Sequence, residues 1–132
     1  MKFSHLLSFA LSLLLVQCSD LGTPVDVSLD SSIDGKTAHY PVGARFSIEL
    51  DLHADSGYLW DCNISDTTVV RTDGATSYRP KDPTIAIGGM IVATFHFQAH
   101  ARGHSTITLT ELRVWERNIP PLNIVRFDVD VK

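Results

Sequence analysis

Apolar and polar residues alternate along much of the chain after residue 24. Segments with this alternation are 25–29, 46–52, 91–97, 107–109 and 125–131. Because successive side chains of a strand point to opposite faces, the pattern predicts β-strands with one buried face and one solvated face. The segments 58–64 and 67–71 are rich in aromatic and β-branched residues, which makes them further strand candidates.

Turn-forming residues separate the expected strands. They are Asp34-Gly35, Pro41 with Gly43, Ser56-Gly57, Asp73-Gly74, Asp82-Pro83, Gly88-Gly89, Gly103 and Pro120-Pro121. No convincing helix follows the first apolar run. About seven or eight short strands in roughly 110 residues predict an all-β fold, an immunoglobulin-like antiparallel β-sandwich over residues 25–132.

The first 24 residues have a different character. Leu6 to Val16 is an almost wholly apolar run that follows the basic Lys2. Its length is too short to span a bilayer and is typical of the core of a secretory signal, which we expect to cover residues 1–17. Residues 18–24 are then expected to form a short tether.

The end of the apolar run, Leu15-Val16-Gln17-Cys18, resembles the lipobox of bacterial lipoproteins. Gln17 departs from the small residue that usually precedes the cysteine. The resemblance implies cleavage before Cys18, lipid modification of that cysteine and anchoring of the protein to a membrane of the bacterial envelope. Without lipidation of Cys18, the protein is expected to be secreted.

The charge of the chain excludes one class of function. The chain carries a net charge of −4 and has no block of basic residues, so it lacks the electrostatic footprint of a nucleic-acid-binding protein. Cys18 and Cys62 are the two cysteines, and a lipidated Cys18 would leave Cys62 alone. We expect Cys62 to be a small buried residue on the same strand face as Trp60, and we expect Trp60 to lie in the core on a central strand.

Three histidines recur at intervals of four residues, at His96, His100 and His104. On a helix this spacing would favour a metal site. Here His96 falls on an expected strand and residues 101–103 on a turn, so no metal or cofactor is predicted.

Catalytic groups are not arranged in any pattern that predicts an enzyme. Asp51 with Asp55, and Glu111 with Glu116, are possible carboxylate pairs, but each is expected to be a solvent-facing charge. Ser56 lacks the glycine-flanked turn of a serine nucleophile. The chain is therefore not expected to be an enzyme.

Three short motifs lie between the expected strands. They are His53-Ala54-Asp55-Ser56-Gly57-Tyr58-Leu59-Trp60, Ala86-Ile87-Gly88-Gly89 and Arg113-Val114-Trp115. Loops at one end of a β-sandwich can converge to form one binding surface. In order and spacing, residues 44–131 resemble the chagasin family of inhibitors of papain-like cysteine peptidases, whose motifs are N-P-T-T-G-Y-x-W, G-x-G-G and R-P-W.

The match to the family motifs is partial. Gly-Tyr-x-Trp, Gly-Gly and Arg-x-Trp are retained. The departures are His53-Ala54 for Asn-Pro, Asp55-Ser56 for the two threonines, Ala86 for the first glycine and Val114 for the proline. A carboxylate at Asp55 would be repelled by a catalytic thiolate unless it meets the catalytic imidazolium.

The resemblance implies a monomeric, reversible inhibitor that is not cleaved and that wedges three loops into the active-site cleft. The residues expected to bind the peptidase are Asp55, Ser56, Gly57, Tyr58, Gly88, Gly89, Arg113 and Trp115. Two aromatic rings, Tyr58 and Trp115, are candidate anchors, and the Gly88-Gly89 pair allows close approach of two backbones. Tyr58 could instead complete a turn, and Gly88-Gly89 could be an ordinary hairpin turn. The alternative function is a non-inhibitory immunoglobulin-like surface module.

Overall fold

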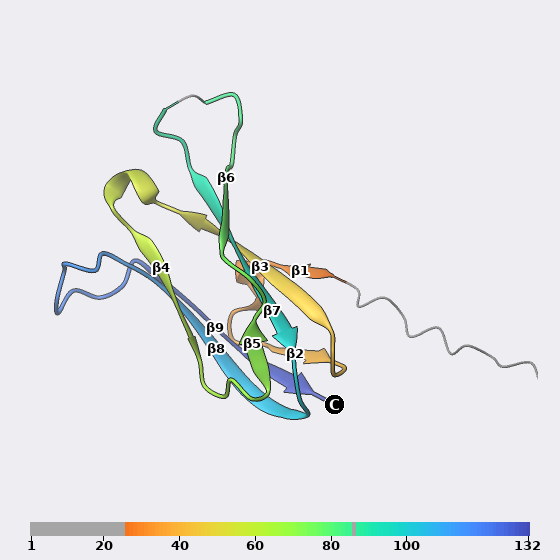
Figure 1. Ribbon diagram of the computed structural model, residues 1–132. Helices are drawn as coiled ribbons and strands as arrows, with labels where there is room; N and C mark the ends of the chain where they lie inside the picture. Colours follow the sequence, from red (N-terminus) through yellow and green to blue (C-terminus); the bar gives the residue numbers. More distant parts are fainter. Residues whose placement is uncertain (1–25, 86) are drawn as a thin grey trace, which may run out of the picture.

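The protein is described by a computed structural model that covers residues 26–85 and 87–132. Two β-sheets form the described part of the chain, with two single-turn 3-10 helices, η1 (Ser31–Ile33) and η2 (Ala54–Ser56) (Figure 1). The strands are β1 (Val27–Leu29), β2 (Thr37–Tyr40), β3 (Arg45–Leu52), β4 (Leu59–Ile64), β5 (Val70–Thr72), β6 (Ser77–Pro80), β7 (Ile91–Ala99), β8 (Gly103–Leu112) and β9 (Asn123–Val131).

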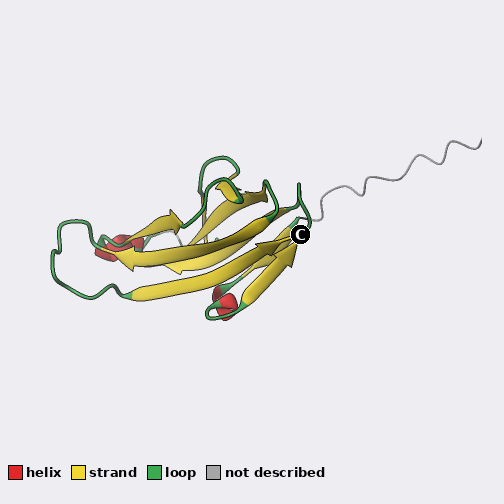
Figure 2. Ribbon diagram, turned by 90° about the horizontal axis from the view of Figure 1, so that it is seen from below, coloured by secondary structure: helices red, strands yellow, loops and turns green. Residues whose placement is uncertain are grey.

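The two sheets pack face to face as a sandwich (Figure 2). One sheet has the order β1-β3-β7-β5, with β6 also paired to β7, and the other has the order β2-β9-β8-β4. This arrangement confirms the predicted all-β, immunoglobulin-like fold. The long central pairs are antiparallel, whereas the short pairs β1–β3 and β2–β9 are parallel, a detail that the alternation did not indicate.

The core lies between the sheets and consists of the apolar residues of the alternating segments. Phe46, Phe97 and Phe127 are almost fully buried, and Ile48 and Ile107 are completely buried. Full burial of each such side chain contributes about 1.5–3 kcal/mol, so these alternating positions supply much of the driving force for folding.

Three details of the strand prediction were wrong. The segment 67–71 begins with a turn, because the Asp66 carboxylate accepts hydrogen bonds from the Thr68 amide (2.9 Å) and hydroxyl (2.5 Å); β5 starts only at Val70. The same bonds lower the pKa of Asp66. Strands β2 and β6 were not predicted, because each has only four residues and every residue of β6 is exposed. Trp60 lies on β4, an edge strand of its sheet in the described structure, rather than on a central strand.

The predicted signal segment 1–17 and tether 18–24, including Cys18, lie outside the described residues. Within residues 26–85 and 87–132, no helix is both long and apolar enough to cross a membrane.

Candidate functional site

Three loops lie at the same end of the sandwich (Figures 1 and 2). The first loop, residues 53–58, joins β3 to β4. The second loop, residues 81–90, joins β6 to β7, and the third loop, residues 113–122, joins β8 to β9. The first loop lies between the other two in Figure 1, so the described residues of the three motifs lie at one end of the sandwich.

The first loop is a compact turn closed by its own backbone. Gly57 has the left-handed conformation (φ +80°) and its N–H donates to the Ala54 carbonyl at 3.0 Å. The amide of Tyr58 donates to the His53 carbonyl at 3.3 Å. Asp55 and Ser56, at the outer part of the turn, are exposed. A residue with a side chain rarely adopts this backbone conformation, which explains the glycine at position 57.

Trp115 of the third loop lies directly over Gly57. A Cβ atom at Gly57 would come within 2.3 Å of the indole Cη2 of Trp115. The side chain of Trp115 is nevertheless 64% exposed. Gly57 therefore has two roles, since it permits the turn and leaves room for an indole ring that faces solvent.

Arg113 holds the first and third loops together. Its Nε donates to the Ser56 carbonyl at 2.7 Å, and its Nη1 donates to Glu116 Oε1 at 2.7 Å. The hydrogen bond with Glu116 raises the pKa of Arg113. The guanidinium lies 4.4 Å from the centre of the Tyr58 ring, in cation–π geometry. Tyr58 is thus half-buried and packs against the core, so it supports the loop instead of projecting from it.

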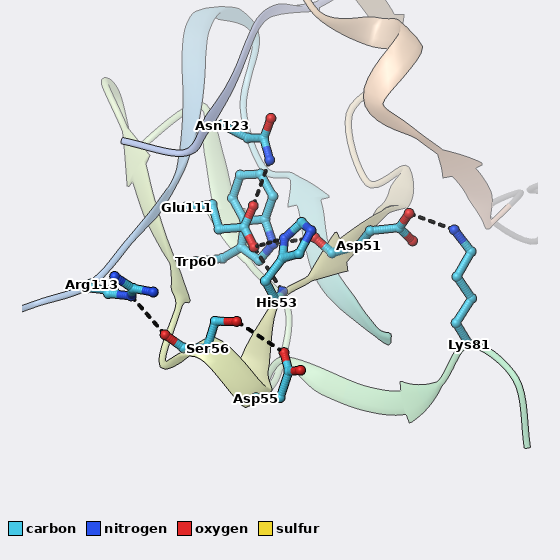
Figure 3. Close-up of polar contacts among 9 residues, drawn as sticks. All are labelled: Asp51, His53, Asp55, Ser56, Trp60, Lys81, Glu111, Arg113 and Asn123. Carbon is cyan, nitrogen blue, oxygen red and sulfur yellow. Dashed lines mark hydrogen bonds and ion pairs between the residues drawn. The ribbon is translucent and has the colours of Figure 1, made fainter. Parts of the chain in front are cut away.

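A buried carboxylate lies beneath these loops (Figure 3). Glu111, on β8, is fully buried, which contradicts the expectation that it faces solvent. Its Oε1 accepts hydrogen bonds from the His53 amide at 2.9 Å and lies 2.8 Å from His53 Nδ1. Its Oε2 accepts a hydrogen bond from Asn123 Nδ2 at 2.7 Å. Glu111 therefore joins the start of the first loop to the residue that follows the third loop.

The second loop is tied to the sandwich at its base. Lys81 Nζ lies 2.6 Å from Asp51 Oδ2, and the Lys81 amide donates to the Met90 carbonyl at 2.8 Å. Ile87 is 92% exposed, and Gly88 has the left-handed conformation (φ +75°). The Gly88-Gly89 pair thus lies in a ten-residue loop that presents an exposed isoleucine, not in a two-residue hairpin turn.

Trp60 and Cys62, which the sequence also suggested, pack against the core. Trp60 is half-buried against the core, and its indole N–H donates to the Asp51 carbonyl at 3.0 Å. Cys62 packs on the same face, and burial, with the nearby Asp61 charge, raises its pKa to about 11, so the thiol stays protonated at neutral pH. Across residues 26–85 and 87–132, no group of His, Cys, Asp and Glu side chains is arranged to hold a metal ion.

Two structural features of the candidate site were missed in the sequence. The Glu111–His53–Asn123 network and the Arg113–Tyr58 stack join residues that are far apart in the chain. The alternation of β8 did contain a signal for the burial of Glu111, because this residue falls in register with the buried Ile107 and Leu109.

A comparison with protein-family models matches residues 39–131 to the model described as "Chagasin family peptidase inhibitor I42". The chain belongs to the chagasin family. This membership supports the expected class of function, a cysteine peptidase inhibitor, and is consistent with the expectation that the chain is not an enzyme. A comparison with curated proteins gives no match.

Solved structures share the fold of this chagasin-family chain. The cysteine protease inhibitor EhICP2 from Entamoeba histolytica has a TM-score of 0.72 at 20% identity, over 80% of this chain and 95% of that chain. Amebosin has a TM-score of 0.65 at 19% identity, over 81% and 98%. PbICP-C, solved in complex with falcipain-2, has a TM-score of 0.57 at 21% identity, over 80% and 99%.

Proposed function

We propose that the protein is a reversible, non-cleaved inhibitor of papain-like cysteine peptidases that inserts its three loops into the active-site cleft as a monomer. The observation that carries the proposal is the exposed indole of Trp115, which lies over Gly57 where the third loop meets the first. A large aromatic side chain fixed at the surface is typical of an interface anchor.

The loop surface is held in place before any partner binds. Arg113 fastens the third loop to the first, Glu111 fastens the base of the first loop, and Lys81 fastens the second loop to β3. Such preorganisation lowers the entropy lost on binding, since fewer side chains and loops must be ordered. The exposed Ile87 of the second loop offers a further apolar contact.

The conformation of the first loop also supports resistance to cleavage. Residues 54–56 form a 3-10 turn that ends at a left-handed Gly57 and is closed by backbone hydrogen bonds. A peptide that pairs with a cleft through its main chain is extended, so this turn does not present a scissile bond in that geometry.

Replacing Trp115 with alanine tests the proposal. The inhibition constant for papain or a papain-like cathepsin is expected to rise about tenfold or more, because a buried aromatic anchor contributes at least 1–2 kcal/mol to many interfaces. Val42, which is 49% exposed in the turn at the opposite end, provides the control: Val42→Ala should leave inhibition unchanged. Equal inhibition by the wild type and the Trp115 variant would remove the basis of the proposal.

We also propose that the protein is exported and anchored by a lipid on Cys18. The apolar run and the lipobox-like Leu15-Val16-Gln17-Cys18 support this. Cells that express the wild type in the presence of labelled palmitate should yield a labelled, membrane-associated protein, and the Cys18→Ser variant should carry no label. A wild-type protein that is exported without label would instead indicate secretion.

A further inference from the structure

The tip of the first loop carries a carboxylate that has little compensation within the protein. Asp55 is exposed, and its polar contact in the described structure is a long one, 3.5 Å from Ser56 Oγ. Figure 3 shows the two side chains in contact with each other and separate from the buried Glu111 network. The Asp55 carboxylate is therefore free to meet a charged group of a partner.

The basic side chains that fasten the loops are already paired. Arg113 bonds to Glu116 and to the Ser56 carbonyl, and Lys81 pairs with Asp51. These pairs cancel their own charges and do not neutralise Asp55. The first loop thus keeps an unpaired charge, and such a charge on a binding surface selects partners by electrostatic complementarity.

We propose that Asp55 faces the catalytic imidazolium at the centre of the peptidase cleft, so that its charge makes the protein bind the charged, active form of the enzyme more tightly than a form without the imidazolium. The inference rests on the proposed function, because it requires the first loop, which lies between the other two, to reach the centre of the cleft. A cysteine peptidase holds its nucleophile as a thiolate beside a protonated histidine, so both signs of charge are present there. Apposition to the imidazolium favours binding, whereas apposition to the thiolate opposes it.

The experiment measures the dissociation constant for papain in two forms. One is the active enzyme, and the other carries a methylthio group on its catalytic cysteine, introduced with methyl methanethiosulfonate. The blocked enzyme has lost the thiolate, and at about pH 7.5 its histidine has lost the partner that kept it protonated. The added methylthio group obstructs the wild type and the variants alike. The ratio of the variant and wild-type dissociation constants therefore reports the effect of the charge.

Asp55→Asn is expected to bind active papain about tenfold more weakly than the wild type, and the difference should vanish with blocked papain. Asp61→Asn is the matched control, since it removes the same charge from an exposed position on β4 and should bind both forms as the wild type does. Asp55→Asn binding active papain as tightly as the wild type, or more tightly, would overturn the role of Asp55 while leaving the proposed function intact. No binding of the wild type to active papain would overturn both.

Discussion

Replacing Gly57 with valine is expected to weaken inhibition strongly while the sandwich stays folded. The new Cβ would lie 2.3 Å from the Trp115 indole, so either the ring or the turn must move. The left-handed conformation (φ +80°) adds a cost of about 1–3 kcal/mol for a β-branched residue. Inhibition of papain should weaken about a hundredfold or more, because the first and third loops both lose their arrangement.

Gly43 offers a matched control for this substitution. It has a similar left-handed conformation (φ +89°) in the turn at the opposite end, and nothing lies within 4 Å of a Cβ there. Gly43→Val should lower the melting temperature by a similar amount and leave inhibition unchanged. If Gly57→Val inhibits as well as Gly43→Val does, the contact between the first and third loops has no functional importance.

Removal of the Glu111 carboxylate is expected to have the largest effect on stability. Glu111→Ala would leave the His53 amide and the Asn123 side chain without their acceptor and open a cavity beneath the loops. Loss of a buried, hydrogen-bonded carboxylate costs about 3 kcal/mol or more, which corresponds to a fall of roughly 10 °C or more in melting temperature. Thermal unfolding followed by circular dichroism measures the change.

Two further variants separate burial from charge in this test. Glu49 forms an exposed ion pair with Arg79, so Glu49→Ala should cost less than about 1 kcal/mol. Glu111→Gln keeps one oxygen acceptor in the same shape, and its melting temperature should fall between those of the wild type and Glu111→Ala. If the melting temperature of Glu111→Ala equals that of Glu49→Ala, the buried network does not stabilise the fold.

Much of the fold could be predicted from the sequence because the core follows the alternation. Residues 46–52 and 125–131 show it most clearly, and they form the long strands β3 and β9. Edge strands β2 and β6 could not be predicted in this way, since the four residues of β2 are too few for an alternation to stand out and every residue of β6 is exposed. Their pairing depends on the position of β9 and β7, which only the folded structure supplies.

The candidate site was predicted only in part for a related reason. The motifs placed Gly57, Trp115 and Gly88 in loops, and the structure brings these loops to one end. The role of Tyr58 could not be decided from the sequence, because its contacts with the core and with Arg113 join residues that are far apart in the chain. Glu111 was wrongly assigned to solvent, because a carboxylate is seldom fully buried and its partners are remote in sequence.

Active-site binding by the three loops is tested most directly by steady-state kinetics. Papain and a papain-like cathepsin are titrated with the wild-type protein at several substrate concentrations, and the mass of the inhibitor is measured after long incubation. The account predicts competitive inhibition with an inhibition constant below about 1 μM, one inhibitor bound per active site, and an intact chain. Full enzyme activity at about 10 μM protein, inhibition that substrate does not relieve, or cleavage within one of the three loops would contradict it.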